Sequence, residues 1–158
     1  MLAQLRTRVS LVVLASLALL AACSSAPVLP IAPITVTDAW ARSTSATAGT
    51  SAAYATITNA GTAADALVGA SSPVAASAEV HQTTAVGSPS ASSGGMMGML
   101  PVARVEIPAG GSLQLQPGSY HVMLVGLTKD LVIGQTIELT LTFEKAGPIT
   151  VMAQVRAS

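Results

Sequence analysis

The sequence predicts a single domain of all-β structure, and three observations lead to this fold class. Apolar and β-branched residues are grouped in many short runs, with the lengths of strands rather than of helices. Turn-forming residues separate these runs, as in Asn59-Ala60-Gly61, Pro117-Gly118 and Ala146-Gly147-Pro148. No stretch shows a convincing helical period. Many short strands at this spacing are typical of a β-sandwich or a Greek-key barrel.

The N-terminal segment, residues 1–22, has the features of an export signal. Arg6 and Arg8 form a positive region, and the apolar run of residues 11–20 is too short to span a bilayer. The motif Leu20-Ala21-Ala22-Cys23 resembles a bacterial lipobox, which implies that Cys23 carries lipid. The alternative is an ordinary signal in which Cys23 has no role. The lipobox predicts an exported protein, anchored to the membrane on the periplasmic or cell-surface side.

A proline-rich tether follows, over residues 23–33. Pro27, Pro30 and Pro33 exclude a helix there and favour an extended chain that holds the domain, residues 34–156, away from the membrane. Without Arg6 and Arg8, five basic residues face seven acidic ones, a net charge near −2. With no basic run and few aromatics, the mature chain is not expected to bind nucleic acid.

Strands are expected at nine places along this domain. They cover residues 36–41, 53–59, 66–70, 78–84, 102–107, 112–115, 121–125, 136–143 and 149–155. Alternation of apolar and polar residues is clearest over 136–143, where Ile137, Leu139, Leu141 and Phe143 share one face.

Within the strand expected at 121–125 lies the motif His121-Val122-Met123. Side chains alternate along a strand, so His121 and Met123 leave the same face, roughly 7 Å apart at the backbone. An imidazole nitrogen suits copper and a thioether sulfur favours the soft ion Cu(I). The alternative is a hydrogen-bonded core histidine beside a packing methionine.

The other soft donors lie nearby in the sequence. The chain has two histidines, His81 and His121, and four of its six methionines fall between positions 81 and 123. Met99 precedes His121 by 21 intervening residues, and Met96 and Met97 are close to it.

These residues resemble the PCu(A)C family of periplasmic and extracellular copper chaperones. Its signature is a His, a Met about ten residues later, a gap of 21 or 22 residues, and His-x-Met. The runs Asp38-Ala39-Trp40-Ala41-Arg42, Ala52-Ala53-Tyr54, 67–73 and 139–144 also resemble the family's own, in the same order, so the resemblance covers residues 34–156.

One spacing departs from the family pattern. Between His81 and Met99 there are 17 residues, and the excess falls in the Ser/Gly-rich stretch 87–95. Loop insertions cost little free energy, because closure entropy grows slowly with length. The longer loop leaves Met97 as a possible substitute for Met99.

The resemblance implies a cupredoxin-like Greek-key sandwich that binds Cu(I) through His81, Met99, His121 and Met123. It also implies delivery of copper to a haem-copper oxidase subunit, directly or through a thioredoxin-like assembly protein. The chain is expected to be a monomeric carrier and not an enzyme, because no Ser/His/Asp set or phosphate loop stands out and the mature domain has no cysteine ligand for blue copper.

Two rival functions stay open at this point. One is a non-metal β-sandwich lipoprotein, acting as an adhesin or an assembly module, in which the histidines and methionines only pack. The other is a general copper-tolerance scavenger, whose site would be the same as that of an oxidase chaperone.

Overall fold

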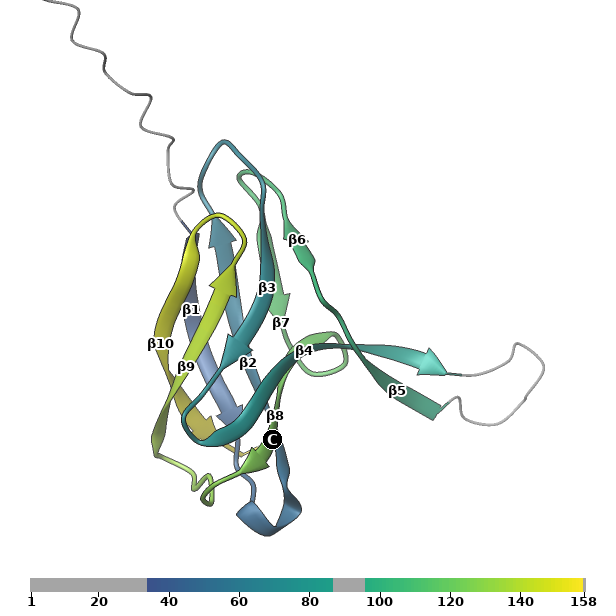
Figure 1. Cartoon of the computed structure of the whole chain (residues 1–158), viewed down its shortest axis with the longest axis vertical. Coiled ribbons are helices and arrows are strands. Elements are labelled where there is room, and N and C mark those ends of the chain that lie inside the picture. Colours follow the sequence, from purple (N-terminus) through teal and green to yellow (C-terminus); the bar gives the residue numbers. More distant parts are fainter. Residues whose placement is uncertain (1–33, 87–95, 158) are drawn as a thin grey trace, which may run out of the picture.

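The computed structural model describes residues 34–86 and 96–157, which form ten β-strands and one turn of 3₁₀-helix (Figure 1). The predicted all-β class is confirmed. The strands are β1 (Ile34–Arg42), β2 (Thr50–Asn59), β3 (Asp65–Ser71), β4 (Ala75–Val86), β5 (Met96–Pro101), β6 (Val105–Ile107), β7 (Ser112–Leu115), β8 (Tyr120–Leu127), β9 (Thr136–Phe143) and β10 (Gly147–Arg156), with the helix η1 at Ala46–Ala48. The signal, the tether and the stretch 87–95 lie outside the described residues. Within the described part, no helix has the length and apolarity to cross a membrane.

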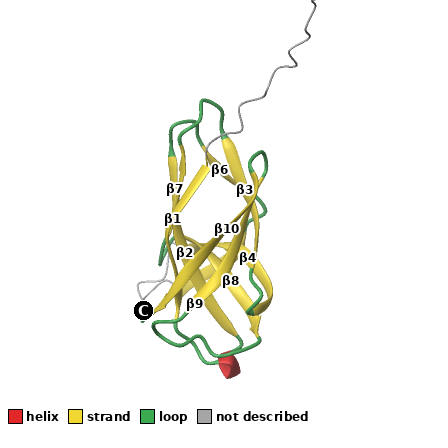
Figure 2. Ribbon diagram, turned by 90° about the vertical axis from the view of Figure 1, so that its left-hand side faces the viewer, coloured by secondary structure: helices red, strands yellow, loops and turns green. Residues whose placement is uncertain are grey.

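The strands wrap around one core. Neighbouring pairs run in the order β4, β8, β2, β1, β10, β9, β3, and β3 pairs again with β4 through Ala70 and Ala78. Figure 2 shows these strands surrounding the interior of the domain. β5 pairs only with β4 at the outer end of this order, and the two strands project from the body as a ribbon (Figure 1).

The core is formed by the alternation that the sequence predicts for residues 136–143. Ile137, Leu139, Leu141 and Phe143 of β9 are at most 2% exposed. They pack with buried residues of β2, β3, β8 and β10, among them Ile57, Leu67, Leu124 and Val155. Burial of such side chains contributes about 1.5–3 kcal/mol each, which makes this layer the main source of stability.

Most predicted strands are observed, with two differences. β5 is not among the predicted strands, because Gly98 and Pro101 have low strand propensity; pairing with β4, in which Met99 faces Thr83, holds it extended. The strand expected at 102–107 is shorter, covering Val105–Ile107. Val102 instead donates its backbone N–H to the carbonyl of Val80 as the chain leaves β5.

A β-bulge in β1 determines which side chains face outward. Thr37 pairs with Thr56 and Trp40 with Tyr54, so β1 has one extra residue between these pairs. Asp38 adopts a left-handed φ of 52° at this point. The extra residue reverses the alternation, since Ile34 is buried before the bulge and Ala41 after it. Trp40 and Arg42 therefore leave the core side of the sheet.

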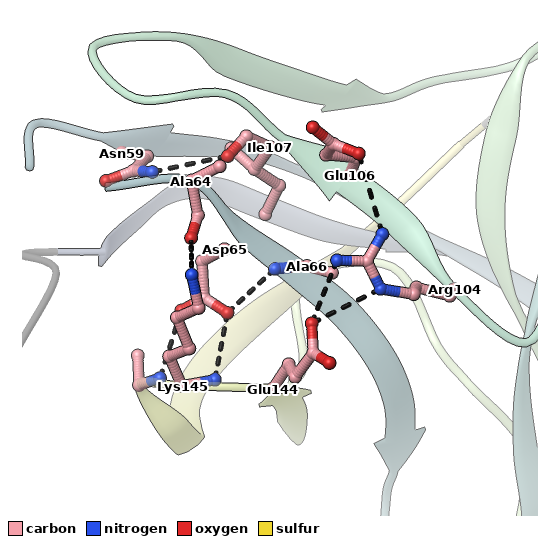
Figure 3. Close-up of polar contacts among 10 residues, drawn as sticks. Asn59, Ala64, Asp65, Ala66, Arg104, Glu106, Ile107, Glu144 and Lys145 are labelled. Atoms are coloured by element: carbon pink, nitrogen blue, oxygen red, sulfur yellow. Dashed lines mark hydrogen bonds and ion pairs between the residues drawn. The ribbon is translucent and has the colours of Figure 1, made fainter. Parts of the chain in front are cut away.

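A buried carboxylate joins β3 to the β9–β10 turn. Asp65 is 1% exposed, and its oxygens accept backbone N–H groups from Ala66, Lys145 and Ala146 at 2.7, 2.9 and 3.0 Å (Figure 3). Burial alone would raise the pKa of Asp65, but the three backbone donors outweigh it, and the pKa lies below its ordinary value. The ionised carboxylate therefore stabilises the fold.

We expect Asp65→Asn to lower the free energy of unfolding at neutral pH by about 1.5–3 kcal/mol, because an amide cannot accept all three N–H groups. The native carboxylate's contribution is present above its unfolded pKa of about 3.9 and is lost as the pH falls through the lower folded pKa. Urea titrations should therefore show that the difference in free energy of unfolding between the native protein and the variant is smaller at pH 3 than at pH 7. Glu106→Gln is the control, since this exposed partner of Arg104 should cost less than about 1 kcal/mol. An equal cost for both variants would contradict the prediction.

Candidate metal site

The two histidines face each other across neighbouring strands. His81 of β4 pairs directly with His121 of β8, and their ring centroids are 5.9 Å apart. The adjacent residues Val80 and Val122 belong to the core. Because side chains alternate along a strand, both imidazoles lie on the opposite side of the sheet from the core. The histidines are therefore outside the hydrophobic core, although His121 is only 3% exposed.

Hydrogen bonds fix the proton on each ring. His121 Nδ1 is 3.1 Å from the backbone carbonyl of Ser119, which can only accept, so Nδ1 carries the proton. His81 Nε2 lies 3.1 Å from a carboxylate oxygen of Glu79 and donates to it. When the rings are neutral, these hydrogen bonds leave the lone pairs on Nε2 of His121 and Nδ1 of His81.

These two nitrogens are buried and have no hydrogen-bond partner among the described residues. An unsatisfied buried polar atom costs about 1–3 kcal/mol, so two of them on paired histidines require an explanation. Metal-binding histidines have the same arrangement, in which one ring nitrogen donates to a carboxylate or carbonyl and the other holds the metal. The pair is therefore chemically suited to a metal ion.

Two methionines lie on the same side of the sheet. Met123 follows His121 by two residues on β8, and Met99 of β5 pairs with Thr83, two residues beyond His81 on β4. Met99, His121 and Met123 line one pocket of about 500 Å³, and Met99 is 53% exposed. The strand register thus brings all four predicted site residues to one region, although His81 is not part of the pocket wall. The backbone of Met97 pairs with Ala85, farther along β4 from His81.

Aromatic rings extend the row of histidines. Tyr54 of β2 lies 6.4 Å from His121, and Trp40 of β1 stacks on Tyr54 at 4.4 Å between centroids. Tyr54 is 4% exposed, yet it lines the pocket rather than belonging to the main core cluster. Pro117 and Gly118, from the turn before β8, form another wall of the pocket.

Glu79 and the Ser119 carbonyl are not among the predicted ligands, although each lies within hydrogen-bond distance of one of the two histidines. Glu79 stands two residues before His81, which places the two on one face of β4. That spacing is a signal, but an exposed glutamate on a strand is usually only solvated. The role of the Ser119 carbonyl depends on the turn that precedes β8, and it leaves no mark in the sequence.

The described residues offer no alternative site of harder ligands. Within residues 34–86 and 96–157, no group of three or more His, Cys, Asp or Glu side chains could hold a metal ion. The donors that the strands bring together are imidazole nitrogens and thioether sulfurs.

Comparison with known proteins gives the family. The family model for LpqE-like lipoproteins matches residues 34–155, almost the whole described domain. The chain belongs to the LpqE-like family. This LpqE-like chain is also 32% identical over 123 residues to "Putative lipoprotein Lxx21020" of Leifsonia xyli subsp. xyli, covering 78% of the chain and 69% of that protein.

Solved structures connect the LpqE-like chain to PCuAC domains. The copper-bound PCuAC domain from PmoF2 has 25% identity and a TM-score of 0.64, covering 81% of this chain and 96% of that domain. The solution structure of CuI-DR1885 from Deinococcus radiodurans has 32% identity and a TM-score of 0.58, covering 85% and 84%. The predicted β-sandwich of PCuAC type is confirmed, and the resemblance found in the sequence extends to the fold.

Proposed function

We propose that this LpqE-like protein is an extracytoplasmic copper chaperone that carries Cu(I). In this proposal His81 Nδ1, His121 Nε2 and the sulfurs of Met99 and Met123 are the ligands. The observation that carries it is that His81 and His121, paired across β4 and β8, each have one buried ring nitrogen without a hydrogen-bond partner among the described residues. The similarity to domains solved with copper supports the choice of metal.

The donor set favours Cu(I) over other ions. Thioether sulfur is a soft ligand that selects Cu(I), while Mg²⁺, Ca²⁺ and Mn²⁺ prefer oxygen ligands. The sequence after Cys23 contains no cysteine, so the thiolate of a blue-copper electron-transfer centre is missing. Thioethers and imidazoles also resist the oxidising conditions outside the cytoplasm better than thiolates do.

Neutral ligands and an exposed Met99 suit a carrier that must release its cargo. Four neutral donors leave the full charge on Cu(I), and a partner that offers better ligands can reach it through the pocket. We propose that the recipient is a haem-copper oxidase subunit or a thioredoxin-like assembly protein, and that the chain performs no catalysis. A copper-tolerance scavenger would have the same site. Deletion of the gene distinguishes the two functions: for a chaperone we expect the copper content of the oxidase to fall, whereas for a scavenger only the cell's survival in excess copper would fall.

A Cu(I) titration tests the site. In competition with a chromogenic Cu(I) chelator, the mature protein should bind one Cu(I) per chain. X-ray absorption should show two nitrogen and two sulfur neighbours of the copper. Met152→Leu is the control, because Met152 lies on β10, is 60% exposed and should not change the result. No uptake of Cu(I) in the presence of the chelator would favour the non-metal alternative, in which these side chains only pack.

We also propose that Cys23 is the site of lipid attachment, consistent with the lipoprotein family to which the chain belongs. Cys23→Ala should move the protein from the membrane fraction to the soluble or secreted fraction, or leave the signal uncleaved. Fractionation followed by immunoblotting measures this shift, with Ser24→Ala as the matched control. Normal processing and membrane association of the Cys23→Ala protein would refute the lipobox.

A further inference from the structure

The pocket that holds three of the proposed copper ligands is much larger than a copper ion. At about 500 Å³, it is in the range of sites that bind small molecules or several side chains of a partner. Met99, His121 and Met123 line one part of it. A second part of the lining consists of a cation and of hydroxyl-bearing or small residues, which come from β1, β2 and the segment between them: Arg42, Thr44, Thr50, Ser51 and Ala52.

Strand register places Arg42 near the copper ligands. Ala41 pairs with Ala53, so Arg42 faces Ala52 when this register continues by one residue, and Ala52 pairs with Met123. Two strand spacings, about 10 Å in all, therefore separate the backbones of Arg42 and Met123. The small side chain of Ala52 leaves the space between them open. The bulge at Asp38 is what turns Arg42 to this side of the sheet.

Arg42 is the single charged residue among those lining the pocket, and it makes no ion pair with the described residues. Two carboxylates lie on segments next to the pocket, Glu79 opposite Met123 and Asp130 beside Leu131, which pairs with Thr44; both accept hydrogen bonds from other groups. Glu79 accepts from His81, and Asp130 accepts the backbone N–H of Ala46 at 2.7 Å. The backbone of Arg42 is held, because its carbonyl accepts the hydroxyl of Ser51 at 2.8 Å. A bound Cu(I) would add a second positive charge to the same pocket.

We propose that this part of the pocket is an exchange subsite, in which Arg42 binds a carboxylate carried by the molecule that gives or takes the copper. The inference rests on the proposed function. A guanidinium recognises a carboxylate by paired hydrogen bonds, and the pocket hydroxyls supply further polar contacts. Anchoring the carboxylate brings the sulfur or nitrogen ligand next to it within reach of the metal. Complementary charge also raises the rate of encounter, by 10-fold or more at low salt in roughly similar cases.

Transfer kinetics with two peptides test the subsite. A short methionine-containing peptide with flanking glutamates and the same peptide with glutamines would each take Cu(I) from the mature protein in stopped-flow experiments at low salt. We expect the native protein to transfer to the acidic peptide about 10-fold faster than to the neutral one. Arg42→Gln should abolish this preference. Its equilibrium Cu(I) affinity, measured with an uncharged chelator, should not fall, because the variant removes a positive charge from the pocket that holds the cation.

The chain offers a matched control. Arg156 pairs with Arg42 across β1 and β10 but does not line this pocket, so Arg156→Gln changes the net charge equally and should keep the preference. Excess glutarate should slow transfer to the acidic peptide in native protein only, which would show that the subsite binds the carboxylate itself. Three results would overturn the inference. The native protein would transfer Cu(I) to both peptides at the same rate, the two arginine variants would lose the preference for the acidic peptide equally, or glutarate would inhibit transfer by Arg42→Gln as strongly as transfer by the native protein. Failure of the proposed function is separate, because it would appear as no Cu(I) bound before any transfer.

Discussion

His121→Ala is expected to lower the Cu(I) affinity of the mature protein by at least about 100-fold. Changes to the outer hydrogen-bond partners of a metal ligand cost 10- to 100-fold in roughly comparable sites, and His121 would be the ligand itself. Its Nε2 is buried, and its ring is held in place by the Ser119 carbonyl. A competition titration against a series of Cu(I) chelators of increasing strength measures the change.

Thr83→Val is the matched control for this prediction. Thr83 lines the same pocket and pairs with Met99, but it supplies no soft donor. Its replacement should leave the affinity within a few-fold. Because His121 lies on the side of the sheet away from the core, thermal unfolding of the metal-free variant should remain cooperative. Unchanged Cu(I) affinity in a folded His121→Ala protein would refute the assignment of the site.

Met99→Leu is expected to weaken Cu(I) binding by about 10- to 100-fold, more than Met97→Leu does. Leucine keeps the volume and apolar character of methionine, so the loss reports on sulfur rather than on packing. Met99 pairs with Thr83, two residues from His81, whereas the backbone of Met97 pairs with Ala85. The double variant should lose more Cu(I) affinity than either single variant.

X-ray absorption at the copper edge checks which methionine binds. We expect one sulfur neighbour in Met99→Leu and two in Met97→Leu, with Met152→Leu as the unaffected control. If copper has two sulfur neighbours in Met99→Leu and one in Met97→Leu, then Met97 is the ligand and Met99 is not. That outcome would mean that the 17-residue interval between His81 and Met99 has shifted the register of the ligands.

The sequence predicts most of the fold because alternation and turn residues act locally. β7 and β9 have the predicted bounds, and the four apolar residues of β9 are buried as their alternation indicates. β5 could not be predicted, because Gly98 and Pro101 disfavour a strand and pairing with β4 outweighs them. The bulge in β1 is equally hidden, since it depends on the register with which β1 pairs to β2 on either side of Asp38.

The sequence also indicates the candidate ligands, but not the strand pairing and hydrogen bonds that orient them. His-x-Met and the second histidine point to copper chemistry through residue type and spacing. The direct pairing of His81 with His121 depends on the register of β4 against β8, which no local signal specifies. The proton positions depend on Glu79 and on the Ser119 carbonyl, and the latter is a backbone atom that any residue could provide.

The separation of the histidine and methionine side chains from the core has a consequence for how the family can diversify. Val80 of β4 and Val122 and Leu124 of β8 belong to the core, whereas His81, His121 and Met123 occupy the alternate positions on the other side of the sheet. A methionine exchanged for histidine on the pocket side would give a harder donor set, suited to Cu(II) or Zn²⁺, without any change in the buried layer. One scaffold could in this way be adapted to different metals by substitutions outside its hydrophobic core cluster.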